Sequence, residues 1–263
     1  PKNKNQLIEF LKENRKNKFK ITILGAGSNT LIRDKGVKGV VIKLGSGFSE
    51  IKKIESEVIE VGAGALDRKV SNFAKENGIG NLEFLSCIPG SLGGAVIMNS
   101  GCYNNDISKV LVSVNTLDFK NCQEKEIKRN EIEFFYRGTN LPKELIITSV
   151  KLKGQLKSKD DIEKKQNELI ERKKISQPNQ IKTCGSTFKN LSDKKKAWQI
   201  IKEAGCDGFS EGDASISKKH CNFFVNNGNA NSSDIEKLIY KVKNTISEKT
   251  GENLELEIKI IGE

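Results

Sequence analysis

The sequence predicts an α+β protein built from two lobes. Alternating apolar residues indicate strands, apolar residues three and four positions apart indicate helices, and the two kinds of segment are mixed along all 263 residues. A highly charged stretch with little apolar content, residues 157–174, interrupts this pattern and is expected to be a helical connector. We therefore expect a first domain at residues 1–155 and a second at residues 156–263.

Composition supports a folded globular protein. Apolar residues make up 36% of the chain, and the 23 glycines bring the total to the globular average. No apolar run reaches the roughly 18 residues that a membrane span needs, and no export signal is visible. The six cysteines form no C-x-x-C pair and there is one histidine, so we expect no metal site, reduced thiols and a cytoplasmic location. The first residue is not Met, which indicates a fragment.

The net charge of +11 is compatible with nucleic-acid binding, with attraction of anionic small molecules, or with a surface that is simply rich in lysine. Lysines alternate with glutamates, as in residues 163–174, and do not gather on one element with aromatic residues between them. This arrangement disfavours a nucleic-acid partner.

In the first lobe, Leu7, Phe10 and Leu11 share one face and predict a helix over residues 5–16. Asp67 is the expected N-cap of a further helix that ends at Gly78. Strands are predicted at residues 19–24, 57–61, 109–119 and 145–153.

The first of these strands runs directly into Gly25-Ala26-Gly27-Ser28-Asn29. A dinucleotide fingerprint needs a third glycine where Thr30 stands, followed by a helix, and the next residues suggest a turn and a strand instead. Two interpretations stay open: backbone N–H groups that hold a pyrophosphate with the Ser28 and Asn29 side chains, or a plain turn after a strand.

Residues 85–103 form a second glycine-rich segment. Pro89 beside Gly90 marks a turn, and apolar residues separate the glycines, so this is not a solvated linker. Either the backbone packs closely against a flat or anionic ligand, or the segment is a tight turn inside the core. Arg137 follows three aromatic residues and is either a stacked surface arginine or a buried carboxylate clamp.

The second lobe is predicted to contain helices at residues 193–204 and 233–249 and strands at residues 220–226 and 254–261. In the last strand, Glu255 and Glu257 share the polar face, which is ordinarily the solvated face of an edge strand. The single histidine, His220, is expected to be structural, and Gly185-Ser186-Thr187 is not the nucleophile elbow of a hydrolase.

Taken together, these motifs resemble the UDP-N-acetylenolpyruvoylglucosamine reductase family. The resemblance covers nearly the whole chain, and the short spacing between Arg137 and Ser186 resembles the compact type II subtype. The matching segments are G-A-G-S-N-T-L-I-R-D-K-G (25–36), L-E-F-L-S-C-I-P-G-S-L-G-G-A (82–95), M-N-S-G-C-Y (98–103), F-Y-R (135–137), C-G-S-T-F-K-N (184–190), K-H-C-N-F (219–223) and L-E-L-E-I-K-I-I-G (254–262). The resemblance implies a vanillyl-alcohol-oxidase-type (PCMH-type) FAD-binding lobe, a smaller α+β substrate lobe, and a further strand ahead of residue 1.

The implied activity is the NADPH-dependent, FAD-mediated reduction of UDP-N-acetylglucosamine enolpyruvate to UDP-N-acetylmuramate, for bacterial cell-wall synthesis. The resemblance implies that Ser186 donates a proton while Arg137 and Glu257 polarise the substrate carboxylate. The implied FAD-binding residues are Gly25, Gly27, Ser28, Asn29, Pro89, Gly90, Gly93, Gly101 and Tyr103. The implied substrate-binding residues are Tyr136, Lys174, Asn190 and His220. We expect a monomer, with no nucleic-acid partner and no insertion into a membrane.

The chain departs from the family pattern at three positions. Asn104 stands where glycine is common, Leu191 where proline usually follows F-K-N, and Lys259 where many members carry arginine. Two other functions remain as alternatives: a related FAD-dependent oxidoreductase with a different substrate, and a basic nucleotide-binding protein without catalytic activity.

Overall fold

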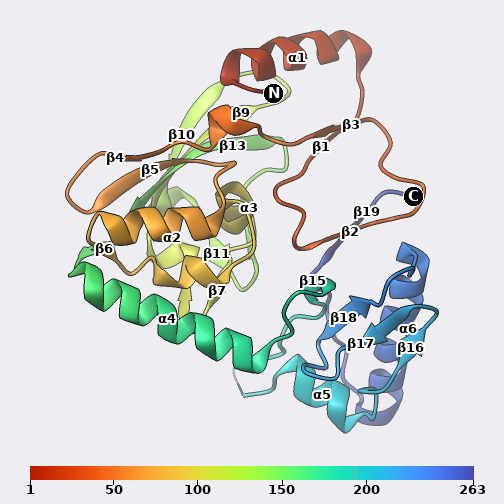
Figure 1. Cartoon of the computed structure of the whole chain (residues 1–263). Helices are drawn as coiled ribbons and strands as arrows, with labels where there is room; N and C mark the ends of the chain where they lie inside the picture. The colour runs from red at the N-terminus through yellow and green to blue at the C-terminus, as the bar shows by residue number, and fades with distance from the viewer. Residues whose placement is uncertain (193) are drawn as a thin grey trace. The chain divides into compact units, whose positions relative to one another are not determined.

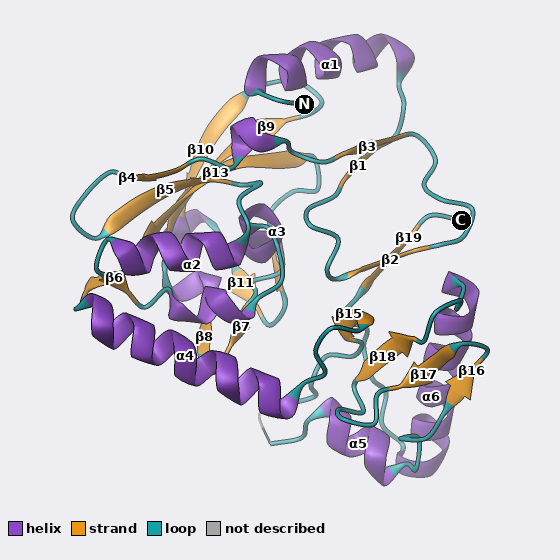
Figure 2. Ribbon diagram, viewed as in Figure 1, coloured by secondary structure: helices purple, strands orange, loops and turns teal. Residues whose placement is uncertain are grey.

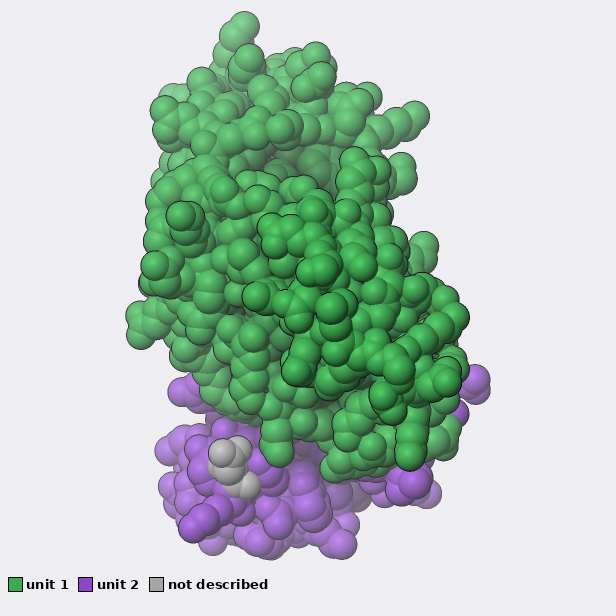
Figure 3. Space-filling model, turned by 90° about the vertical axis from the view of Figure 1, so that its left-hand side faces the viewer, with its two compact units in different colours: residues 1–26, 39–172 green, residues 27–38, 173–263 purple. Residues whose placement is uncertain are grey.

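The computed structural model describes residues 1–192 and 194–263, which divide into two compact units (Figures 1 and 2). Unit 1 comprises residues 1–26 and 39–172, and unit 2 comprises residues 27–38 and 173–263 (Figure 3). These units are defined by packing alone. The predicted domains, residues 1–155 and 156–263, were distinguished by the ligand that each binds, and that division stays a prediction.

Unit 1 is organised around an antiparallel sheet with the strand order β10-β9-β13-β5-β4. The helices of the unit are α1 (Lys4–Asn17), α2 (Asp67–Glu76), α3 (Leu92–Ile97) and α4 (Lys159–Ser176), the last of which runs on into unit 2. The sheet strands are β4 (Ile51–Lys53), β5 (Val58–Gly62), β9 (Leu111–Asp118), β10 (Glu124–Lys128) and β13 (Leu145–Lys153). Shorter pairs are β1 (Ile21–Ile23) with β3 (Val40–Ile42), β6 (Ile79–Gly80) with β14 (Gln155–Leu156), β7 (Gly101–Cys102) with β8 (Asn105–Asp106), and β11 (Phe134–Phe135) with β12 (Gly138–Thr139). Single 3-10 turns are η1 (Ser46–Phe48), η2 (Glu83–Cys87), η3 (Ile107–Lys109) and η4 (Arg129–Glu131).

The main core of unit 1 lies between this sheet and helices α2 and α3, with η2 beside them. Val61 of β5, Val114 of β9 and Val150 of β13 are each fully buried there. Burying such side chains stabilises the unit by about 1.5–3 kcal/mol each. A separate cluster places Leu7 and Leu11 of α1 against β3, β9 and β13.

Unit 2 pairs a second antiparallel sheet, ordered β15-β18-β17-β16, with two helices. Its elements are β2 (Thr30–Ile32), β15 (Lys182–Ser186), α5 (Ala197–Glu203), β16 (Ser210–Glu211), β17 (Ala214–Ile216), β18 (Phe223–Asn226), α6 (Ser232–Thr250) and β19 (Lys259–Ile261). The apolar stripe of α6 is buried, as its spacing predicts, and packs with α5 and the sheet. The parallel pair β2–β19 joins the segment 27–38 to the C-terminal strand.

Several predicted elements differ from the observed ones. Leu66 is the N-cap of α2 and Asp67 is its first helical residue, so the predicted capping role of Asp67 is wrong. The strand predicted at residues 220–226 begins only at Phe223, because the preceding residues form a turn. The helix predicted at residues 193–204 is observed as Ala197–Glu203, and residue 193 lies outside the described residues.

Helix α4 is more than a connector. Its Ile162, Gln166 and Leu169 are buried, and the Gln166 side chain donates hydrogen bonds to the Ser71 carbonyl (3.1 Å) and to Ser71 Oγ (2.7 Å) on α2. The sequence analysis did not identify this buried face, because it is narrow and most residues of the helix are charged. Within the residues that the structure describes, no helix combines the length and the apolar character that crossing a bilayer requires.

Candidate active site

The glycine-rich turn between η2 and α3 is fastened to the segment that leads into α2. Asp67 N donates to the Gly90 carbonyl (3.1 Å), and Gly93 N donates to the Ala63 carbonyl (2.8 Å). Pro89 is exposed at the tip of the turn and Gly90 is half-buried. The backbone of this turn is therefore held rigidly while its tip remains accessible.

The two glycine-rich loops of the sequence approach each other at Gly25. A Cβ atom built on Gly25 would lie 2.6 Å from Ser91 Oγ, so a side chain there would require the Ser91 hydroxyl to move. At Gly93 it would lie 3.0 Å from Ala63 Cβ, so packing also restricts that position. A Cβ on Gly27 would meet no heavy atom within 4 Å, and its φ is +81°. Close packing therefore explains Gly25 and Gly93, whereas Gly27 presents open backbone of the kind that a phosphate-bearing ligand needs.

Tyr103 and Asn104 form the two-residue turn of the hairpin β7–β8. Their φ angles are +52° and +66°, so both are left-handed, as a type I′ turn requires. This geometry explains why glycine suits position 104 and why asparagine is tolerated there. The guanidinium of Arg172 lies 4.6 Å from the centre of the Tyr103 ring and covers one of its faces.

Arg137 occupies a second two-residue turn, between β11 and β12, with φ at +59°. Its guanidinium lies 4.9 Å from the centre of the Tyr136 ring, and Nη2 donates to the Gly101 carbonyl (3.1 Å). These contacts show a guanidinium stacked on Tyr136, and the predicted binding of a carboxylate by Arg137 stays a prediction. The carbonyl of Gly101 therefore links the Arg137 turn to the hairpin that carries Tyr103.

Asn99, which the sequence analysis did not single out, supports the same turn. It is 7% exposed, and its Nδ2 donates to the Phe135 carbonyl (3.2 Å), while its Oδ1 accepts from Ser108 N (3.0 Å). The sequence offered one signal that Asn99 has a functional role, namely its position in the M-N-S-G motif at residues 98–101.

In unit 2, Ser186 ends β15 directly after Gly185, whose φ is +83°. The register between β15 and β18 shifts between Thr183 and Ser186, so a bulge precedes the serine. A bulge bends its strand and changes the direction in which the following side chains point. This bulge therefore sets the direction of the chain at Ser186.

The segment after Ser186 also pairs with the segment that leads into β19. Phe188 faces Leu256, and Glu257 N donates to the Thr187 carbonyl (2.9 Å). The Glu257 carbonyl in turn accepts from Asn29 Nδ2 (3.0 Å). The structure therefore brings the backbones of Ser186 and Glu257 onto adjacent segments of unit 2.

The strand predicted at residues 254–261 is wrong over residues 254–258, because β19 begins only at Lys259; Glu255 and Glu257 lie in the segment before it, where they differ. Glu255 is exposed and forms an ion pair with Lys189 (Nζ to Oε2, 3.2 Å), whereas Glu257 is half-buried. The solvated-face interpretation therefore holds for Glu255, and Glu257 is the better candidate for a functional carboxyl group.

His220 is held in one tautomer. Its Nδ1 accepts a hydrogen bond from Asn222 N (3.2 Å), which leaves the proton on Nε2. The ring packs edge-on against Phe223 (4.9 Å between centres) and Trp198 (6.4 Å). Burial lowers the pKa of His220, so the imidazole is neutral near pH 7. Nε2 is therefore the ring nitrogen that can donate a hydrogen bond to a ligand.

The remaining predicted substrate residues lie in less enclosed surroundings. Asn190 Oδ1 accepts from Ala197 N (3.0 Å) at the start of α5. Lys174 is exposed near the end of α4, and its carbonyl accepts a hydrogen bond from Lys219 Nζ. Ser28, one of the predicted FAD-binding residues, is half-buried in the loop before β2.

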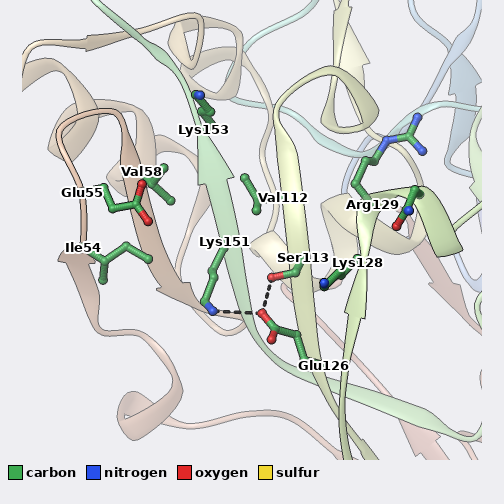
Figure 4. Close-up of a pocket in the computed structure, with 11 residues that line it drawn as sticks. Ile54, Glu55, Val58, Val112, Ser113, Glu126, Lys128, Arg129, Lys151 and Lys153 are labelled. Carbon is green, nitrogen blue, oxygen red and sulfur yellow. Dashed lines mark hydrogen bonds and ion pairs between the residues drawn. The ribbon is translucent and has the colours of Figure 1, made fainter.

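One surface hollow of unit 1 is unrelated to these residues. It has a volume of about 690 Å³ and lies over β5, β9, β10, β13 and the turn between β4 and β5 (Figure 4). Within its lining, Glu126 accepts hydrogen bonds from Ser113 Oγ (2.7 Å) and Lys151 Nζ (2.9 Å). None of the site residues predicted from the sequence lines this hollow. Among the described residues, no group of three or more His, Cys, Asp or Glu side chains could hold a metal ion.

Comparisons with known proteins agree with this description. Residues 1–121 match the family model "FAD binding domain", and residues 177–261 match "UDP-N-acetylenolpyruvoylglucosamine reductase, C-terminal domain". The reductase of Pelagibacter ubique is 49% identical over 263 residues, which cover 99% of this chain and 86% of that protein. The reductase of Rickettsia akari is 41% identical over 262 residues, covering 100% of this chain and 88% of the relative. The crystal structure of the Thermus caldophilus reductase aligns with a TM-score of 0.82 at 32% identity, over 95% of this chain and 89% of that one.

Proposed function

Because the chain belongs to the UDP-N-acetylenolpyruvoylglucosamine reductase family, we propose how its own residues perform the family reaction. The reaction reduces the enolpyruvyl group of UDP-N-acetylglucosamine enolpyruvate with NADPH and yields UDP-N-acetylmuramate, a precursor of peptidoglycan. FAD, when bound, supplies the hydride transfer from NADPH to C3 of the enolpyruvyl group. The protein must then stabilise charge at the carboxylate and protonate C2.

The residues present fit FAD. The open backbone at Gly27, with Ser28 and Asn29 after it, suits a pyrophosphate. The accessible tip at Pro89 and Gly90 and the aromatic ring of Tyr103 suit the remainder of the cofactor. FAD binding is proposed for residues 1–155 and UDP-sugar binding for residues 156–263.

Ser186 is proposed as the group that protonates C2. A serine hydroxyl is a weak acid, but a carbanion-like C2 is a strong base, so the position of Oγ matters more than its pKa. The observation that supports this role is the restrained backbone around Ser186, with a bulge before it, its own pairing with Phe223 of β18, and the bridge between Phe188 and Leu256 after it. Such restraint reduces the entropy lost on reaching the reactive geometry.

Arg137 and Glu257 are proposed to act on the substrate carboxylate. The guanidinium of Arg137 would offset the negative charge that develops there, as oxyanion-hole donors do. A carboxyl group at Glu257 assists only when it is protonated or when it orients a neighbouring donor. Tyr136 and His220 are proposed to line the pocket that NADPH and substrate share, and Lys174 and Asn190 to contact the diphosphate and the sugar.

Anaerobic visible spectroscopy of the purified protein tests the whole proposal. NADPH should bleach the flavin band, and UDP-N-acetylglucosamine enolpyruvate should restore it. Bleaching without return would keep the flavoprotein but point to a related oxidoreductase with a different substrate. Failure to bind added FAD would contradict the proposed cofactor site.

The protein is further proposed to act as a monomer. Light scattering of the flavin-loaded protein should give the mass of one chain. A mass of two chains, constant on dilution, would contradict this assignment.

A further inference from the structure

The side chain of Asn222 takes the place of a strand residue beside Ser186. Its Oδ1 accepts a hydrogen bond from Phe188 N (2.9 Å), and its Nδ2 donates to the Phe188 carbonyl (2.8 Å). This reciprocal pair is the pattern that two facing residues of an antiparallel sheet make with their main chains. In addition, Thr187 N donates to the main-chain carbonyl of Asn222 (2.7 Å). Three hydrogen bonds therefore run from one residue to the two positions that follow Ser186.

The position of Asn222 makes these bonds costly to lose. Asn222 is 3% exposed and Phe188 is fully buried, so water cannot replace either partner. A buried main-chain group left without a partner loses the hydrogen bond that it makes with water in the unfolded chain, and this destabilises the fold. Because the ladder between β15 and β18 is interrupted just before Ser186, the Asn222 side chain supplies the pairing that the strands cannot.

Nothing about Asn222 suggests that it contacts a ligand. Both polar ends of its side chain are engaged with Phe188, and the residue lies in the turn that carries His220. Its effect on the reaction must therefore pass through the backbone of residues 186–188.

We propose that Asn222 is a positioning residue that holds Ser186 Oγ in place for protonation of C2. This inference rests on the proposed role of Ser186. It implies that a change at Asn222 slows the step that uses the serine and leaves the step between NADPH and the flavin unaffected.

Asn222→Asp is the sharpest variant, because it keeps the shape and the acceptor but removes the donor that faces the Phe188 carbonyl. Asn222→Ser is measured beside it, since it shortens the polar side chain without adding a charge. The exposed Asn227, whose Nδ2 donates to Ser215 Oγ (3.0 Å), provides the matched control Asn227→Asp. Circular dichroism and bound flavin establish that each variant is folded.

Stopped-flow spectroscopy separates the two half-reactions. For Asn222→Asp we expect flavin bleaching by NADPH at the wild-type rate and a return of the band that is slower by about 10- to 100-fold. The solvent deuterium isotope effect on the return should rise, because proton delivery becomes rate-limiting. Asn227→Asp should match the wild type in both steps.

A double variant identifies the route of the effect. If Asn222 acts through Ser186, adding Asn222→Asp to Ser186→Ala should cause little further loss. Equal slowing of both half-reactions, an unchanged isotope effect, or a fully additive loss would overturn the inference. A wild-type rate of flavin return in Ser186→Ala would instead refute the role of Ser186 itself, so the two failures are distinguishable.

Discussion

The side-chain amide of Asn29 donates a hydrogen bond to the main-chain carbonyl of Glu257 (Nδ2 to O, 3.0 Å). The main chain adds a second bond, from Lys259 N to the Asn29 carbonyl (2.9 Å). The resemblance to the family assigns Asn29 to the cofactor, yet its side-chain donor is used on the main chain of Glu257. Asn29 therefore supports the last residue of the proposed catalytic set as well as the loop to which it belongs.

Removal of this amide should loosen the segment that leads into β19. We expect Asn29→Ala to lower the free energy of unfolding by about 1 kcal/mol, the net contribution of one hydrogen bond. Urea unfolding measures the difference. The exposed Asn130 supplies the control Asn130→Ala, which should stay within about 0.5 kcal/mol of the wild type. Equal unfolding midpoints for the two variants would show that the Asn29–Glu257 bond contributes nothing.

Ser186→Ala should separate the half-reactions of the enzyme. The flavin should remain bound and NADPH should bleach it at a near-normal rate, because the hydroxyl is proposed to act only on the substrate. The return of the flavin band with substrate should slow by about 10²- to 10⁴-fold, the usual contribution of a positioned proton donor. Loss of both steps together would contradict the assignment.

Arg137→Ala should remove electrostatic stabilisation from the substrate carboxylate. By analogy with an oxyanion-hole donor we expect a loss of about 3 kcal/mol, seen as a fall in kcat/KM of about 100-fold. Arg137→Lys should recover little of it, because an ammonium lacks the planar fork. Exposed Arg68, changed to alanine, is the control for lost positive charge. A comparable fall in the control would assign the effect to general attraction of anions.

Asp67 should make the stability of the protein depend on pH. Its side chain is fully buried, and neither carboxyl oxygen has a hydrogen-bond partner among the described residues. Burial raises the pKa of Asp67 to about 8. The folded protein therefore keeps a proton that the unfolded chain releases near pH 4, so stability falls as pH rises between these two values.

The measurement compares Asp67→Asn with the wild type. Between pH 5.5 and pH 8.0 the wild type should lose about 3 kcal/mol more unfolding free energy than the variant. Comparing the two slopes cancels the opposite contribution of His220, whose pKa burial lowers. Exposed Asp160, changed to asparagine, should leave the slope of the wild type intact. Parallel slopes for all three proteins would mean that Asp67 is ionised when folded.

The left-handed turn at Tyr103 and Asn104 predicts opposite effects for two substitutions. Asn104→Gly should leave the stability unchanged or raise it slightly, because glycine adopts a φ of +66° without strain. Asn104→Val should cost about 1–2 kcal/mol. Thermal unfolding of the two variants checks this, and a stable valine variant would mean that the turn is not left-handed in solution.

Local patterns predicted the regular elements well. The helix α6 and the strand β13 were expected within one residue of their observed ends, because their apolar spacing and their flanking residues are unambiguous. Asp67 was predicted to cap α2 because an acidic residue at the start of a helix usually has that role. The prediction was wrong, since Asp67 is the first residue inside the helix and its side chain is buried. Whether that carboxyl group turns outward to cap the helix or inward to the core is decided by the packing around it.

The roles of individual site residues depended on resemblance to a family, since strand periodicity placed Glu255 and Glu257 on one face without distinguishing them. Tertiary structure separates them: Glu255 pairs with Lys189 in solvent, and the backbone of Glu257 is held from both sides. Asn99 and Asn222 were not predicted for a related reason. An asparagine in a loop is ordinary in a sequence, and only the folded chain shows which main-chain groups it satisfies.

The sequence by itself therefore determined the α+β class, most of the helices and strands, and the family. These depend on spacing along the chain, which a linear pattern records. The tertiary structure decided which polar side chains serve the backbone: Asn29 for Glu257, Asn99 for Phe135 and Asn222 for Phe188. The physical reason is that a buried hydrogen bond joins groups far apart in sequence, and its partner is chosen by packing after the chain has folded.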